Sequence, residues 1–151
     1  MTTNAGKQDN FVDAIKNLIE LEHDIKELYD QAINKSVSDN YKIKLNEFSK
    51  DHAHHIEKIS ELLTNRKEQI PIMSGFVRPL INTIKVEFAN LVEDQAELSN
   101  IINNEKDIHK VYERINARHD RWDEAKELLK QALQDQKKHM AWLEETIKSL
   151  N

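Results

Sequence analysis

Mostly apolar side chains recur at alternating intervals of three and four residues over four long stretches of the chain. This spacing returns each side chain to the same side of an α-helix, and it is typical of helices packed in a bundle. The four sets, called seams below, are Phe11, Ile15, Leu18, Glu22, Ile25, Tyr29 and Ala32; Tyr41, Leu45, Phe48, His52, His55, Ile59 and Leu62; Leu98, Ile101, Glu105, Ile108, Tyr112 and Ile115; and Trp122, Ala125, Leu129, Ala132, Gln136, His139, Leu143 and Thr146.

The composition favours an all-α fold and narrows the classes of partner. The 151 residues include only two glycines and two prolines, and residues that favour helices predominate. The formal charge of −5, without a long basic run, argues against binding to nucleic acid. We expect no membrane partner and a cytoplasmic location, because no apolar run is long enough to span a membrane and the start is polar. The chain has no cysteine, so any metal ligand must be His, Glu, Asp or Gln.

Breaks in the pattern divide the chain into two helical hairpins. Two short polar links each predict a pair of antiparallel helices, whereas both prolines fall in one long break. An apolar stripe after the prolines, made of Ile81, Ile84, Phe88 and Leu91, predicts a crossover helix at about 78–91, followed by a bend or break near Glu93–Asp94. The predicted parts are a disordered N-terminus at 1–8 and a single four-helix bundle at 9–151, made of hairpin 1 at about 9–65, a crossover at 66–93 and hairpin 2 at about 94–150.

Every seam carries polar residues near its middle. They are Glu22; His52 and His55; Glu105; and Gln136 and His139. In each hairpin the glutamate lies about as far before the turn as the polar pair lies after it, so antiparallel pairing brings them to a similar height. Polar groups buried there need partners, which predicts a hydrogen-bonded network or a bound ion.

The two hairpins also resemble each other. A shift of 83 positions superposes Glu22 and Tyr29 on Glu105 and Tyr112, and a shift of 84 superposes Asp51-x-x-x-His55 on Asp135-x-x-x-His139. A duplicated helical hairpin with a long crossover is the simplest description of this pattern.

With these residues the chain resembles the ferritin-like superfamily, in particular the small rubrerythrin-type four-helix proteins. In that family a Glu on the first and third helices and Glu-x-x-His on the second and fourth face a dinuclear metal centre. The tyrosine seven residues after each first Glu is also rubrerythrin-like, here Tyr29 and Tyr112. The resemblance implies a ferritin-like antiparallel bundle and a divalent metal ion, with iron first and zinc or manganese as alternatives. The implied ligands are Glu22, His52, His55, Glu105 and His139, with Gln136 as a further candidate.

The chain departs from the family at the two glutamates that bridge the metals, where it has His52 and Gln136. Glu22 and Glu105 alone supply two negative charges, which balance one divalent ion. We therefore expect one ion, or unequal occupancy of two positions. Its affinity should fall as pH drops through about 6.5, the ordinary histidine pKa.

Other polar groups around the seams receive separate expectations. Asp51 and Asp135 flank the predicted ligands and are expected to accept hydrogen bonds from the histidine rings, with Tyr29 and Tyr112 also beside the ligands. The remaining histidines lie off the seams and are predicted to be on the surface: His23, His54, His109 and His119.

Three functions are compatible with the pattern. The first is a ferritin-like metal protein that handles iron or carries out redox chemistry on O₂ or peroxide. The second is a bundle with a decayed site that serves as a structural or interaction module, and the third is a hemerythrin-like binder of O₂ or iron. The pattern leaves open whether the protein is an enzyme. A homodimer is expected from apolar residues off the crossover stripe, namely Phe76, Val77, Val86 and Val92.

Overall fold

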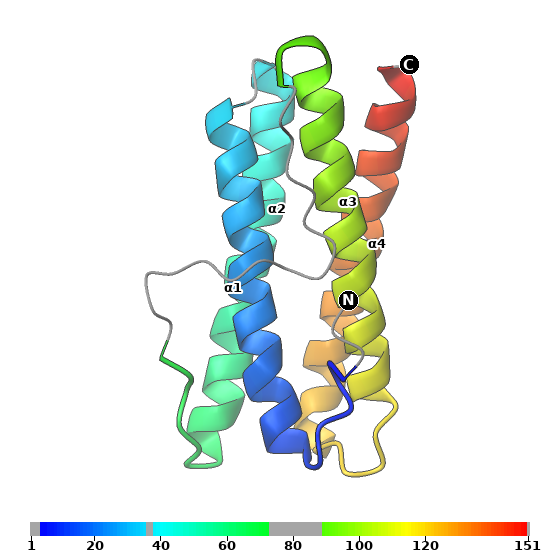
Figure 1. Cartoon of the computed structure of the whole chain (residues 1–151). Coiled ribbons are helices and arrows are strands. Elements are labelled where there is room, and N and C mark those ends of the chain that lie inside the picture. The colour runs from blue at the N-terminus through cyan, green and yellow to red at the C-terminus, as the bar shows by residue number, and fades with distance from the viewer. Residues whose placement is uncertain (1–3, 36–37, 73–88, 151) are drawn as a thin grey trace.

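The computed structural model describes residues 4–35, 38–72 and 89–150, and this part of the chain forms four α-helices and no strand (Figure 1). The helices are α1 (Phe11–Lys35), α2 (Asp39–Asn65), α3 (Ala89–Asn116) and α4 (Lys126–Ser149), with a short 3₁₀ helix, η1 (Asp123–Ala125), before α4. The prediction of an all-α chain is confirmed for these residues. Among them, no helix has the length and apolar character needed to cross a membrane.

The four helices form a bundle of two antiparallel hairpins. α1 packs against α2 and α3, and α4 packs against α3 and α2. In Figure 1, α1 and α4 run in one direction and α2 and α3 in the other, so the end of α2 and the start of α3 lie at opposite ends of the bundle. Each helix therefore contributes one face to a shared interior.

The seams form that interior. All seam residues are buried except Tyr41 and Trp122, which are partly buried. Burial of large apolar side chains such as Leu18, Phe48 and Ile101 contributes roughly 1.5–3 kcal/mol for each side chain. The strict three–four spacing thus predicted which face of every helix packs inward.

The start of α3 differs from the prediction. We expected a bend or break near Glu93–Asp94; no break occurs there, because α3 begins at Ala89 and its helical assignment continues through these residues. The region from Ala89 to Asn116 contains no glycine or proline, so nothing in its backbone chemistry ends the helix there. The rest of the predicted crossover helix at 78–91 lies outside the described residues, as do Phe76, Val77, Val86 and the side chain of Val92.

The N-terminal segment also differs from the prediction. Residues 1–8 were expected to be disordered, yet residues 4–8 lie against the C-terminal part of α3 and Ala5 is buried. Arg114 Nη1 donates to the Ala5 carbonyl (3.1 Å), and Arg118 Nη1 donates to the Gly6 carbonyl (2.9 Å). These two arginines hold a polar segment in place through its backbone, which a pattern of apolar side chains does not reveal.

Gly6 allows this contact, and its replacement provides a first test. Its φ is +83°, and a Cβ built there would lie 3.1 Å from Arg114 Cβ and 3.3 Å from the Val111 carbonyl oxygen. Gly6→Ala should therefore cost about 1–2 kcal/mol, bounded by the free energy with which the segment docks. Thermal unfolding measures the loss, with the exposed Lys7→Ala as the control. Equal melting temperatures for the two variants would contradict the described packing.

Candidate metal centre

A layer of polar side chains crosses the middle of the bundle. The six polar seam residues lie at this level and none is more than 1% exposed: Glu22, His52, His55, Glu105, Gln136 and His139. All four helices contribute, α1 and α3 one glutamate each, and α2 and α4 a pair one turn apart. The sequence-predicted residues are thus brought together from positions far apart in the chain.

His52 lies at the centre of the layer, between the two glutamates. Its Nδ1 is 3.1 Å from Glu22 Oε2, and its Nε2 is 2.6 Å from Glu105 Oε1. One imidazole ring therefore joins a carboxylate on α1 to a carboxylate on α3.

The other two histidines occupy equivalent positions on either side. His55 Nδ1 is 3.0 Å from Glu22 Oε2, and His139 Nδ1 is 2.9 Å from Glu105 Oε1. Their Nε2 atoms contact aspartates across the bundle, His55 with Asp135 and His139 with Asp51, each at 2.8 Å. The hydrogen bonds expected for these aspartates are confirmed. The pattern also repeats between the hairpins, as the duplication in the sequence predicted.

The two tyrosines lie beside the glutamates of the opposite hairpin. Tyr29 donates a 2.6 Å hydrogen bond to Glu105 Oε1. Tyr112 OH has no hydrogen-bond partner within bonding geometry among the described residues. Burial and the nearby Glu22 carboxylate nevertheless raise the Tyr112 pKa well above its ordinary value. Both hydroxyls therefore stay protonated and can donate to a carboxylate.

The histidines and glutamates stabilise each other's charged forms. Burial alone would lower the pKa of His52, but Glu105 and Glu22 raise it to about 10. Burial would likewise lower the pKa of His55, but Glu22 and Asp135 raise it to about 9. Burial would raise the pKa of Glu22, but His52 and His55 lower it to about 2. Burial would also raise the pKa of Glu105, but His52 and His139 lower it far below its usual range. These contacts therefore favour the charged forms of His52 and His55 in the absence of a metal.

The same side chains form two groups that could hold a metal ion. Glu22, His52 and His55 make one group, and His52, Glu105 and His139 make the other. In each group the possible ligand atoms lie within 4.8 Å of one another. Imidazole nitrogen and carboxylate oxygen suit Fe(II), Zn(II) and Mn(II). Glu105 Oε2 is buried and has no hydrogen-bond partner among the described residues, so a ligand atom is available there.

Gln136 and His109 form a pair that the sequence did not reveal. His109 was predicted to be on the surface, but it is partly buried and its Nδ1 is 2.9 Å from Gln136 Oε1. The available signal was its position next to the seam residue Ile108, on the side of α3 that faces α4. Gln136 belongs to neither group of possible ligands. His54 and His119 are exposed, as predicted, whereas His23 is partly buried.

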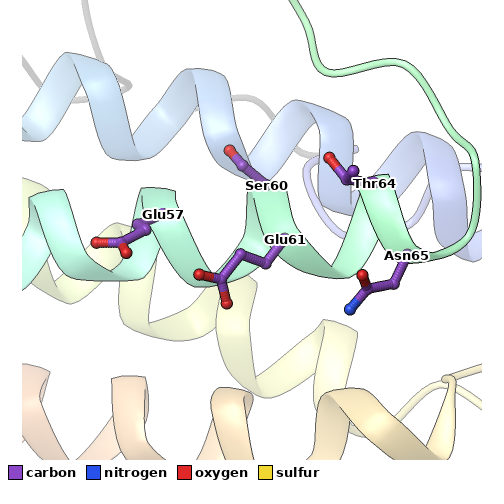
Figure 2. A pocket seen from close by; sticks show the side chains of 5 residues that line it. All are labelled: Glu57, Ser60, Glu61, Thr64 and Asn65. Carbon is purple, nitrogen blue, oxygen red and sulfur yellow. The ribbon is translucent and has the colours of Figure 1, made fainter.

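The surface hollows described for these residues lie away from the polar layer. Figure 2 shows one of about 410 Å³ on the outer side of α2. Its lining is formed by α2 alone: Glu57, Ser60, Glu61, Thr64 and Asn65. A second, of about 650 Å³, lies between α1 and the segment after α2. Neither contains a residue of the polar layer.

Comparisons with known proteins do not place the chain in a family. No family model, no curated protein and no solved structure matches it.

Proposed function

We propose that the protein is a ferritin-like metal-binding bundle that holds one divalent ion in its polar layer. The observation that carries the proposal is the pair of buried three-residue ligand groups at the centre of the four helices. Glu22 and Glu105 would neutralise the ion, and His52, His55 and His139 would supply nitrogen ligands. Two carboxylates balance one divalent ion, so a second ion would be left without compensating charge.

The surroundings of the groups also support metal binding. Metal-bound histidines usually donate their second ring N–H to a carboxylate, which fixes the ring's orientation. His55 and His139 already contact Asp135 and Asp51 in this way. The side chains of Asp135 and Asp51 are 15% and 26% exposed, so they connect the buried rings to solvent. Iron is the first candidate, with zinc or manganese as alternatives. Bound iron would provide for iron handling or for redox chemistry with O₂ or peroxide.

A second candidate function is a purely structural bundle. It is favoured by the hydrogen bonding of the layer, because every ring nitrogen of His52, His55 and His139 lies within 3.1 Å of a carboxylate oxygen without any ion. The hemerythrin-like alternative has less support, since α3 contributes Glu105 but no histidine to either ligand group. Metal content separates the first two candidates.

The expected result is about one equivalent of divalent metal in protein purified without chelator. Removing one ligand from each group, in the double variant His55→Ala/His139→Ala, should abolish binding at micromolar metal. Two controls should retain the ion: His54→Ala, which changes an exposed histidine on the same helix, and Gln136→Ala, which lies outside both groups. Elemental analysis and titration with Fe(II) under nitrogen and with Zn(II) provide the measurement. Absence of binding by the unaltered protein would support the structural bundle instead.

A further inference from the structure

We propose that His52 offers the ion two alternative positions, one in each ligand group, because its two ring nitrogens face opposite carboxylates and the nitrogen that does not bind the ion keeps its hydrogen. The inference rests on the proposed metal-binding function. It adds that the two positions exclude each other, so that the layer holds one ion although it contains two complete ligand groups.

The geometry of one ring is the basis of this inference. His52 is the residue that the two groups share. Its Nδ1 faces Glu22 on α1, and its Nε2 faces Glu105 on α3. The two nitrogens of an imidazole point away from each other, so they cannot bind the same ion. Each nitrogen therefore serves only the group on its own side.

The chemistry of imidazole makes the two positions exclusive. A neutral imidazole has one nitrogen with a lone pair and one N–H. When an ion replaces the proton on Nδ1, Nε2 keeps its hydrogen and donates to Glu105 Oε1, from which it is 2.6 Å away. When an ion replaces the proton on Nε2, Nδ1 keeps its hydrogen and donates to Glu22 Oε2, at 3.1 Å. A second ion would require the ring to lose both protons.

In each case the carboxylate of the empty group also keeps partners for hydrogen bonds. With the ion beside Glu22, the Glu105 carboxylate still accepts hydrogen bonds from Tyr29 and His52 and contacts His139. With the ion beside Glu105, the Glu22 carboxylate contacts His52 and His55. The retained N–H on His52 thus links the filled position to the carboxylate of the unfilled one, in the manner of the hydrogen bonds that usually hold ligand histidines.

The test follows the ring nitrogens of His52 in ¹⁵N-histidine-labelled protein loaded with Zn(II). Unaltered protein should bind one equivalent of zinc. In His55→Ala, which weakens the group at Glu22, His52 should bind zinc through Nε2 and keep its hydrogen on Nδ1. In His139→Ala, which weakens the group at Glu105, the assignment should reverse. The exposed His54→Ala should give the spectrum of the unaltered protein.

A further variant removes the exclusion. In His52→Glu/Gln136→Glu the shared position is a carboxylate, which can bridge two ions and has no N–H to retain, so zinc stoichiometry should rise towards two. Circular dichroism verifies the helices of every variant, and His55→Gln or His139→Gln replaces an alanine variant that does not fold.

Three outcomes would contradict the inference. Two zinc ions bound at once to unaltered protein, with both His52 nitrogens coordinated, would show a bridging imidazolate. Zinc on the same His52 nitrogen in both alanine variants would show a single fixed position. Each of these would leave the proposed metal-binding function standing. Failure of the unaltered protein to bind zinc or iron would overturn that function as well.

Discussion

Metal-free protein should lose stability as the pH rises from about 6.5 towards 10, although many proteins are stable over much of this range. A histidine whose pKa is raised on folding contributes stability that is fully present below its unfolded pKa and is lost as pH rises through the folded value. The relevant pKa values rise to about 10 for His52 and about 9 for His55, against about 6.5 in the unfolded chain. The expected loss is several kcal/mol, since one pKa unit corresponds to about 1.4 kcal/mol.

The two glutamates determine how the stability of metal-free protein falls at acid pH. The pKa of Glu22 is lowered to about 2, and that of Glu105 lies below its usual range. A group with a lowered folded pKa contributes stability above its unfolded value, near 4.3, and loses it as pH falls through the folded value. Metal-free protein should therefore be most stable between about pH 4.5 and 6.5.

Metal affinity should follow the opposite trend and increase above pH 6.5. An ion in the group at Glu22 displaces one proton from His52 and one from His55, so affinity should rise by up to about 100-fold per pH unit until their pKa values are approached. This revises the pH dependence expected from the sequence, which placed the change at an unperturbed histidine pKa. The carboxylate partners of both rings extend it to higher pH.

Urea unfolding between pH 5 and 9.5, in the presence of chelator and then of Zn(II), tests the stability curve. Calorimetry in buffers of different ionisation enthalpy counts the protons released on binding. NMR of the histidine rings measures the two pKa values directly. Values below 7 for both His52 and His55 in metal-free protein would contradict the described contacts.

Replacement of His52 by alanine should have the largest effect of any single substitution in the layer. It removes the shared positive partner of Glu22 and Glu105, and breaking a buried ion pair from one side costs about 3–5 kcal/mol. It also removes a ligand from both groups at once, so metal affinity should fall by more than about 100-fold. Loss of His55 or His139 alone would instead leave one group intact, and the ion would move to it.

Two controls separate this effect from a general loss of packing. Gln136→Ala removes a side chain of similar size at the corresponding position of hairpin 2, without removing a charge. His54→Ala, on the exposed side of α2, should change the free energy of unfolding by less than about 0.5 kcal/mol. Chemical unfolding and zinc titration of the three variants give both quantities. If His52→Ala were no more destabilising than Gln136→Ala, the shared ion pair would contribute nothing to stability.

Sequence periodicity predicted the helical faces and the composition of the polar layer. The six residues of the polar layer could be found because they interrupt apolar seams at matching distances from the two hairpin turns. That Asp51 and Asp135 would accept hydrogen bonds from histidine rings was also predictable, since both flank the seams at the level of the histidines, although each contacts the histidine of the other hairpin.

Features that depend on backbone contacts or on distances between side chains were not predictable. The docking of residues 4–8 depends on carbonyl groups that accept from Arg114 and Arg118, and every residue type carries such groups. The role of His52 as the residue common to both ligand groups depends on where its two nitrogens point. Spacing along a helix gives the face of a side chain but not the direction of each atom.

The difference between His52 and Gln136, at corresponding positions of the two hairpins, affects which halves of the chain recognise each other. Two copies of hairpin 1 would bring two His52 imidazolium groups together at the centre, and their like charges would repel. Two copies of hairpin 2 would place two Glu105 carboxylates at the centre without a cation shared between them. In the unlike pair, a single His52 ring lies between the two carboxylates and contacts both. The difference at this one position thereby favours pairing of hairpin 1 with hairpin 2 over pairing of two copies of the same hairpin.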